Sequence, residues 1–175
     1  MQTEKPFSRA FNAPAGNVTT LNTAMMKRVV EGSRNSPRKR IIFPLHKTAD
    51  SSLHRMLNGL QPYSYIQPHR HLYPPKAESV IVLQGSILSF VFDVTGDITE
   101  VQTLTAGGIN FGVDSEPGVF HTFLALQKDT VLFEVKPGPY EQNSDKDFAP
   151  WAPREGSEKT TEYMDYLYDT GKQNR

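Results

Sequence analysis

The sequence predicts an all-β protein, a jelly roll of two sheets also called a double-stranded β-helix, with an N-terminal helix and a short C-terminal helix. Short apolar runs follow one another between residues 41 and 136, and turn residues separate them. The 13 prolines and 12 glycines of the chain are spread among these runs. Seven or eight short strands at this spacing fit a jelly roll, although an immunoglobulin-like sandwich would share the strand number.

Length and composition limit the classes of function. A chain of 175 residues is about one domain and is long enough to bury a core. Its 19 basic and 19 acidic residues cancel, so no global charge draws it to nucleic acid or to an anionic membrane. The lack of cysteine excludes disulfides and thiolate metal sites. No apolar run approaches membrane-spanning length, and the first residues lack the apolar core of a signal peptide. We therefore expect a cytoplasmic protein with neither nucleic acid nor membrane as its partner.

The N-terminal segment divides into an arm and a helix. Residues 1–17 are interpreted as a flexible arm, in which Phe7 and Phe11 could pack against the body or against a second subunit. Residues 18–175 are expected to form a single domain, because no linker or repeat interrupts them.

A surface helix is expected over residues 20–34. Its apolar positions recur at helical spacing and form one face, made of Leu21, Met25, Val29 and Val30. The polar residues that could cap its first turn are Thr19, Thr20 and Asn22. Gly32 and the turn residues that run to Pro37 end the pattern.

The β core extends from about residue 41 to residue 136. Seven strands are expected over residues 62–71, 78–83, 86–93, 98–103, 109–113, 119–126 and 130–136, and residues 52–60 could form an eighth. Gln84-Gly85 and Thr95-Gly96-Asp97 are expected to be short hairpin turns between neighbouring strands.

Residues 137–169 are expected to form a strap and a helix. Pro137-Gly138-Pro139 ends the last strand, and residues 141–157 are too irregular in composition for a helix. Trp151, the one tryptophan, is interpreted as a cover for the core rather than as a ligand-stacking residue. A short helix over residues 158–168 then begins after Ser157.

Two histidines one residue apart suggest a metal site. On a strand, His69 and His71 point to one face while Arg70 points to the other. The prolines after Tyr73 turn the chain, and a return strand lying antiparallel beside the first would bring Glu78 back to the histidines. Two imidazoles and a carboxylate suit a divalent cation. A His-x-His pair alone is more often surface decoration, so further ligands matter.

A third histidine, His121, opens a later strand after the turn at Pro117-Gly118. The set then resembles the two sequence motifs of the cupin superfamily, His-x-His with a later Glu and Gly, and Pro-x-Gly with a later His. The departures are the missing first glycine, six residues between His71 and Glu78, Glu116 in place of a proline, and Ala125 in place of the final Asn. The resemblance implies a barrel-mouth site in which His69, His71, Glu78 and His121 bind one divalent metal (Zn, Fe, Mn or Ni).

A narrower resemblance runs from about residue 36 to residue 156 and includes the long gap before Glu78. The chain is similar there to the WbuC-type cupin-fold metalloproteins, through segments such as Ser36-Pro37-Arg38, Pro75-Lys76-Ala77-Glu78 and Phe148-Ala149-Pro150-Trp151. These small bacterial proteins are often encoded beside O-antigen and other surface-polysaccharide genes, and no reaction is firmly assigned to them.

Two classes of function stay open from the sequence. The first is a metal-dependent enzyme on a small anionic or sugar-like metabolite, possible because four protein ligands leave two positions of an octahedral ion open. The second is a metal-dependent sugar-binding or sensor module without turnover. Residues that could bind the small molecule are Arg38, Arg40, His46, Tyr65, Arg70, Tyr73 and Lys76. A homodimer is also expected, because cupins bury a sheet face against a second copy.

Overall fold

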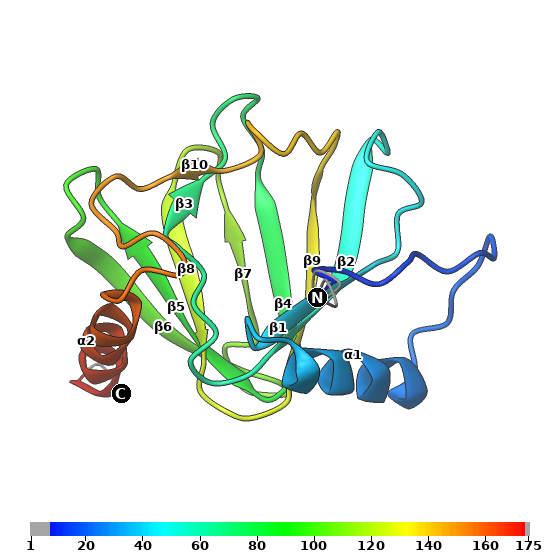
Figure 1. Cartoon of the computed structure of the whole chain (residues 1–175), viewed down its shortest axis with the longest axis horizontal. Coiled ribbons are helices and arrows are strands. Elements are labelled where there is room, and N and C mark those ends of the chain that lie inside the picture. The colour runs from blue at the N-terminus through cyan, green and yellow to red at the C-terminus, as the bar shows by residue number, and fades with distance from the viewer. Residues whose placement is uncertain (1–7, 174–175) are drawn as a thin grey trace, which may run out of the picture.

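Two antiparallel sheets of five strands each pack face to face in the computed structural model, which describes residues 8–173 (Figure 1). The first sheet has the order β1-β2-β9-β4-β7, with bounds Arg40–Pro44, Leu53–Leu60, Thr130–Pro137, Glu78–Gln84 and Gly112–Ser115. The second has the order β10-β3-β8-β5-β6, with bounds Asp147–Phe148, His69–Arg70, Phe120–Ala125, Ser86–Phe92 and Ile98–Thr105. Apart from the hairpin pairs β1–β2 and β5–β6, strands that follow one another along the chain alternate between the sheets, which confirms the expected jelly roll.

The turn at Gly85 does not form the expected hairpin, because β4 and β5 lie in different sheets. Gly85 adopts φ 78°, and a Cβ atom there would lie 2.3 Å from Oγ1 of Thr130, so glycine alone fits this crossing. The turn at Gly96 does join the hairpin partners β5 and β6. The sequence located both turns, but the hairpin expected at Gln84-Gly85 is wrong, because no local pattern shows which turn changes sheets.

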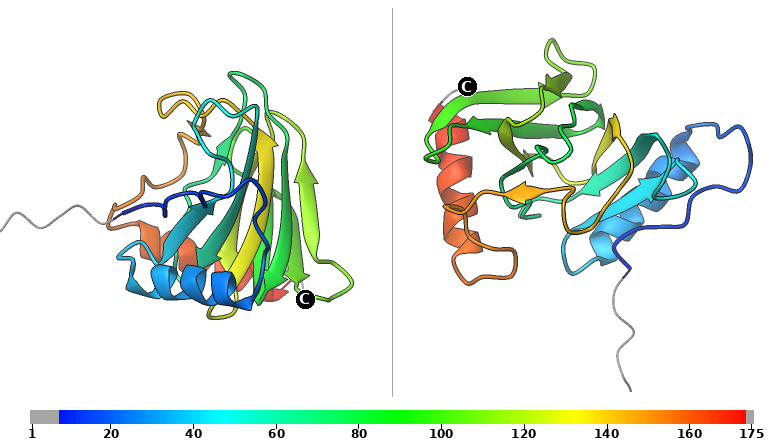
Figure 2. Two further views of the ribbon diagram at one scale, coloured as in Figure 1. Left: turned by 90° about the vertical axis from the view of Figure 1, so that its right-hand side faces the viewer. Right: turned by 90° about the horizontal axis from the view of Figure 1, so that it is seen from above.

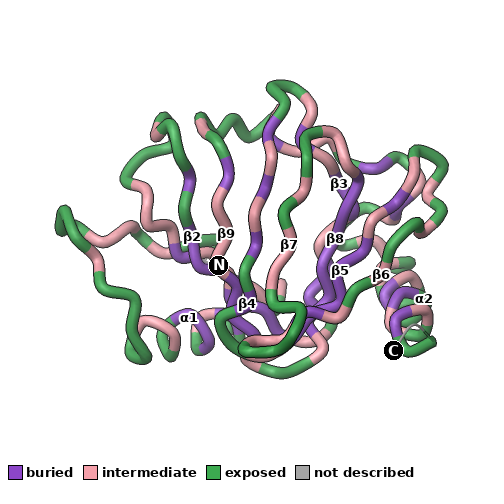
Figure 3. Tube along the Cα trace, turned by 180° about the vertical axis from the view of Figure 1, so that it is seen from behind, coloured by how far each residue is buried: buried purple, intermediate pink, exposed green. Residues whose placement is uncertain are grey.

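The interior between the sheets is apolar in one half of the barrel. Its buried members come from six strands and are Leu60, Val80, Val82, Ile87, Leu104, Phe123, Ala125 and Leu132. β8 is buried at every position and β5 at six of its seven positions, as Figure 3 shows for the middle of the second sheet. Charged side chains that face inward therefore lie in the other half.

The N-terminal helix α1 (Thr23–Asn35) covers the outer face of the first sheet (Figure 1). Asn22 caps it, since its side chain accepts a hydrogen bond from the backbone nitrogen of Met25 at 3.0 Å. Val29 and Val30 pack against Ile41, Phe43, Leu57 and Val131. The helix begins three residues later than the sequence predicted, because Leu21 precedes the cap and is exposed.

The C-terminal helix α2 (Thr160–Gln173) packs on the outer face of the second sheet. Met164 and Leu167 are buried there against Leu88, Phe90 and Leu124. Gly171 lets the last turn approach the sheet, because a Cβ atom at this position would lie 2.3 Å from Cδ1 of Leu88. The helix runs five residues past the predicted end at 168.

The expected strand over residues 62–71 is wrong except at its end, where only His69–Arg70 form β3. Before it, Tyr63 has φ 61° and the backbone nitrogen of Ser64 bonds the carbonyl of Gln61, which is a turn. Tyr65 is buried in the core between the second sheet and α2. The apolar residues of this segment thus reflect burial in a loop. β7 is likewise shifted from residues 109–113, and Ile109 is fully exposed.

The strap, residues 138–157, leads from β9 across the opening between the sheets to α2 (Figure 2). Its short strand β10 pairs with β3, which places Phe148 opposite His69. Trp151 packs on the rings of Phe92 and Phe120, with ring centroids 5.0 and 5.9 Å apart, and covers the core as expected. β10 itself is too short to be recognised in the sequence.

The first described residues lie along β1. The backbone nitrogen of Phe11 bonds the carbonyl of Ile42 at 2.8 Å, and its ring contacts that of Phe43. Phe7 lies outside the described residues. Between residues 8 and 173, neither helix combines the length and the apolar character that a membrane span needs.

Candidate metal centre

Three histidines meet in the half of the barrel that is not apolar. His69 in β3 is the register partner of His121 in β8, so their side chains leave the same face of the second sheet. His71 follows β3 and shares that face by alternation. One ring nitrogen from each of the three lies within 4.8 Å of the other two, and all three side chains are buried. The three histidines named from the sequence therefore form one cluster that could hold a metal ion.

The backbone fixes which ring nitrogen of each histidine faces the centre. Nδ1 of His69 donates to the carbonyl of Gln67 and Nδ1 of His121 to that of Val119, both at 2.9 Å, while Nδ1 of His71 donates to the carbonyl of Asp145. A carbonyl can only accept, so each Nδ1 carries a proton and each Nε2 is left as the ligand atom.

Two of these Nε2 atoms, those of His69 and His121, are buried and lack a hydrogen bond in the part of the chain that the structure describes. Burial, joined by the positive charge of Lys146, holds the pKa of His69 well below its usual value, so this ring is neutral. Buried lone pairs without donors are costly, and a divalent cation is a partner that would satisfy both.

Glu78 reaches this centre from the opposite sheet. Its Oε2 lies 3.1 Å from Nε2 of His71 and its Oε1 lies 3.5 Å from Nε2 of His121. Because Nδ1 carries the proton in both rings, neither Nε2 has a proton to donate to Glu78. A cation held by these residues would satisfy both lone pairs and the carboxylate.

The route by which Glu78 arrives differs from the expected one. The antiparallel pairing of its strand with the His69 strand is wrong, because β3 and β4 belong to different sheets. β4 pairs with β7 and β9 instead. The turn over residues 72–77, closed by a bridge between Leu72 and Pro75, carries the chain from one sheet to the other. The side chain of Glu78 then points back across the interior toward the histidines.

A buried network of opposite charges supports the cluster. Asp145 in the strap accepts from Nζ of Lys76 at 2.9 Å and from Nζ of Lys136 at 2.8 Å. Nζ of Lys136 also lies 3.9 Å from Oε2 of Glu78. Burial would lower the pKa of Lys136, but the surrounding carboxylates raise it, so the ammonium stays charged. Because the carbonyl of Asp145 holds His71, this network joins the strap to the ligand atoms.

Glu134 also faces this half of the interior and was not named from the sequence. It is the register partner of Val80, whose side chain is buried between the sheets. Its Oε2 accepts from Nδ2 of Asn58 at 2.7 Å. Burial, and then the charge of Glu78, raise the pKa of Glu134. The sequence pattern that could have identified Glu134 is the alternation in β9, where Glu134 and Lys136 share a face with the apolar Leu132.

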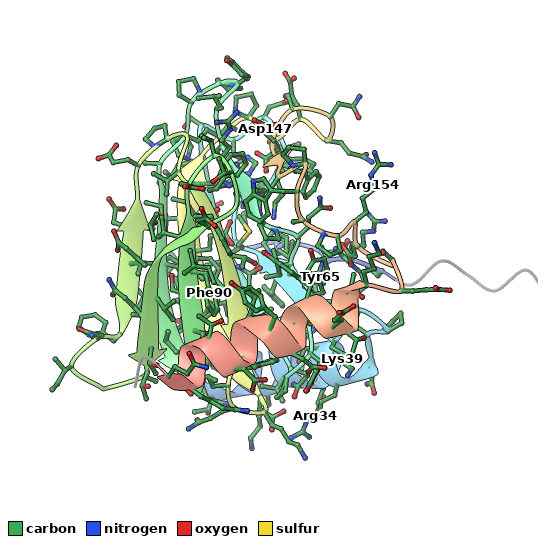
Figure 4. The ribbon with its side chains drawn as sticks, turned by 90° about the vertical axis from the view of Figure 1, so that its left-hand side faces the viewer. Arg34, Lys39, Tyr65, Phe90, Asp147 and Arg154 are labelled. Atoms are coloured by element: carbon green, nitrogen blue, oxygen red, sulfur yellow. The ribbon has the colours of Figure 1, made fainter. Side chains whose placement is uncertain are left out.

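Three predicted small-molecule ligands are engaged with other groups. Arg38 and Arg40 both pair with Glu155, at 2.6 and 2.8 Å. Arg40 lies opposite Leu60 and so faces the interior. Tyr65 lies beside α2, below the strap residue Asp147 in Figure 4, and its hydroxyl donates to the carbonyl of Pro153 at 2.6 Å.

The remaining four lie at different distances from the cluster. Arg70 points to the opposite face from His69 and pairs with Asp147 at 2.7 Å. His46 stacks on His54 with ring centroids 4.0 Å apart. Tyr73 is 72% exposed in the turn before β4. Lys76 is buried against Asp145, so of these four it alone belongs to the network around the cluster.

A polar cavity of about 290 Å³ adjoins the cluster between β5, β6 and β7. Two of its lining residues are direct strand neighbours of the cluster, since Val91 pairs with His121 and Ser115 pairs with Glu78. Its other polar lining residues are Ser89, Glu100, Gln102 and Asp114. The cavity has room for a small polar molecule.

Comparisons with known proteins give a coarse placement. Residues 21–104 match the model of a family described as Domain of unknown function (DUF6016). No curated protein matches the chain.

Solved structures give weak likenesses. KdgF from Halomonas sp. is 17% identical over 59% of this chain and 80% of its own, with a TM-score of 0.44. An oxalate oxidase in complex with glycolate is 16% identical over 66% and 58%, with a TM-score of 0.49. The Cnp3 cupin domain of Schizosaccharomyces pombe is 15% identical over 57% and 64%, with a TM-score of 0.43. The chain spans 23% of the Bacillus subtilis oxalate decarboxylase that it also resembles. The fold assignment rests on the strand order of the two sheets.

Proposed function

We propose that this protein is a metal-dependent enzyme that binds one divalent ion through His69, His71, His121 and Glu78 and acts on a small anionic or sugar-like metabolite. The observation that carries the proposal is the convergence of three Nε2 atoms whose Nδ1 atoms are all held by backbone carbonyls. These hydrogen bonds hold the three Nε2 atoms in position for a cation even when none is bound. Zinc, iron, manganese and nickel all accept imidazole and carboxylate ligands.

A divalent ion in this site would act as a Lewis acid toward an oxygen of the substrate or toward a water molecule. The residues of the chain provide the surroundings for that chemistry. The strap covers the opening between the sheets, and the apolar residues behind the cluster close the other end of the barrel. The cavity beside Val91 and Ser115 leaves room for a small substrate. Lys136 and Asn58 hold the carboxylate of Glu134 in the interior.

Finer parts of the proposal rest on resemblance. The likeness to WbuC-type proteins supports a metabolite from bacterial surface-polysaccharide synthesis. A cytoplasmic location and a homodimer, both expected from the sequence, belong to the same proposal.

The metal site is tested by elemental analysis of protein purified without added metal. We expect close to one ion per chain in the wild-type protein and loss of that ion in the His69→Ala/His71→Ala double variant, with the β-sheet circular dichroism retained. The matched control is His46→Ala/His54→Ala, which removes a stacked histidine pair outside the cluster and should keep the ion. Full metal content in the first double variant would refute the ligand set.

Turnover is tested with the metal-loaded protein and a panel of nucleotide sugars and small carboxylates, followed by NMR spectroscopy and by an oxygen electrode. Consumption that disappears in the His69→Ala/His71→Ala variant would support an enzyme. Binding of a sugar without consumption of any compound would support the sensor or sugar-binding module instead.

A further inference from the structure

Lys146 belongs to the strap and lies directly before β10, next to the histidine cluster. β10 pairs with β3 so that Asp147 lies opposite Arg70 and Phe148 lies opposite His69. Asp147 bonds Arg70 on the outer side, whereas the ring of Phe148 lies 6.1 Å from that of His69 on the cluster side. Lys146 lies between this strand and Asp145, whose carbonyl accepts from Nδ1 of His71, so the backbone of Lys146 passes beside the histidine cluster.

The carboxylates near Lys146 are all engaged with other groups. Both oxygens of Asp145 accept from Lys76 and Lys136. Glu78 lies against His71 and His121, and Glu134 against Asn58 and Lys136. Asp147 pairs with Arg70. Within residues 8–173, Lys146 forms neither a hydrogen bond nor an ion pair. Lys76 and Lys136 both pair with Asp145, so Lys146 is the one of these three lysines without a counter-ion.

The electrostatic surroundings agree with this position. Burial, and then the charge of Lys136, lower the pKa of Lys146 to about 8. Its charge acts in turn on His69 from the second sheet and on Glu134 from the first. The ammonium therefore lies between the two sheets, close to the cluster, and a half-buried ammonium without a counter-ion is costly unless a ligand supplies one.

We propose that Lys146 binds the anionic group of the substrate and that this group is a carboxylate. The inference rests on the proposed metal site, because a carboxylate held by Lys146 would bring its attached carbon skeleton to the three Nε2 atoms. Because a single ammonium lacks a counter-ion, one ligand group with a single negative charge would neutralise it. Arg40, which also faces the interior, is already occupied by Glu155, so it does not compete for the ligand.

The experiment measures anion binding by isothermal titration calorimetry, with acetate and with inorganic phosphate as probes, on cobalt-loaded and on metal-free protein. Lys146→Met should weaken acetate binding by about tenfold or more, since a hydrogen bond to a charged group is lost. Lys146→Arg keeps the charge and should bind acetate within about threefold of the wild-type protein. The control Lys128→Met removes an exposed lysine in the β8–β9 turn and should change nothing. Elemental analysis should show equal cobalt content in all four proteins.

Each outcome decides the matter. Unchanged acetate affinity in Lys146→Met, or no acetate binding by the wild-type protein, overturns the role of Lys146. Tighter binding of phosphate than of acetate overturns the carboxylate. If the wild-type protein does not bind cobalt, the metal site is refuted. The titrations of metal-free protein would still show whether Lys146 binds the anion.

Discussion

Glu78 and His71 lie seven positions apart in the chain, yet their side chains meet from opposite sheets, with Oε2 of Glu78 3.1 Å from Nε2 of His71. The long gap between the His-x-His pair and the glutamate is therefore the length of chain that passes from one sheet to the other. A carboxylate placed in this way can add to the three imidazoles without competing for space on their strands.

Glu78→Gln should reduce metal affinity, because a neutral amide replaces a charged oxygen ligand. The loss should be larger for manganese and iron than for zinc, which imidazoles bind well. Competition titrations with a chelating dye measure the three affinities. Equal affinities in the variant and the wild-type protein for all three metals would show that Glu78 is not a ligand.

Asp145→Ala should destabilise the fold by about 3 kcal/mol or more, because two buried ammonium groups lose their shared partner. Urea unfolding followed by circular dichroism gives the free energy of unfolding. The control Asp169→Ala breaks an exposed pair with Lys172 and should change that free energy by less than about 0.5 kcal/mol. Similar small losses in both variants would contradict a structural role for the network.

The pKa of Lys146 predicts a pH dependence of stability. It is lowered from 10.5 to about 8 in the folded protein, so between these values the unfolded chain binds more protons than the folded one. The free energy of unfolding should then rise with pH between about 8 and 10.5, by at most about 3 kcal/mol from this group. Unfolding of wild-type and Lys146→Met protein across this range isolates the contribution, since other titrating groups are common to both. Parallel curves would mean that Lys146 is not held in the interior without a counter-ion.

Gly171→Ala should destabilise the protein, although alanine is the better helix former by about 1 kcal/mol. The added Cβ would lie 2.3 Å from Cδ1 of Leu88, a side chain with no exposed surface. Thermal unfolding measures the sign. A rise in Tm would show that α2 can shift away from the sheet without loss.

The sequence predicted the elements of this protein better than their pairing. Alternation located most strands of the β core, and Asn22 was among the predicted helix caps, because both depend on neighbours in the chain. The strand expected before His69 failed because burial of Tyr65 in a loop produces the same apolar pattern as a strand. The sheet change at Gly85 depends on contact with Thr130, 45 positions away, which no local pattern shows.

The sequence likewise predicted only those parts of the candidate site that depend on local spacing. The His-x-His spacing and the later turn identified the three histidines that meet. Glu134 and Lys146 were missed because charged residues in a strand or a strap are usually exposed. Alternation in β9 could have identified Glu134, whereas the position of Lys146 depends on the pairing of β10 with β3. Tyr65, Arg38 and Arg40 were grouped by residue type, whereas hydrogen bonds to Pro153 and Glu155 determine where they point.

The hydrogen bond from His71 to the carbonyl of Asp145 couples two equilibria that are far apart in the sequence. Any ion that holds His71 in place also favours the docked position of residues 138–148, and a docked segment favours the ion by the same factor. Amide hydrogen exchange in this segment should slow when metal is added and should speed up when a chelator removes it. The segment can therefore report metal occupancy in a cell extract, where the ion itself is difficult to measure.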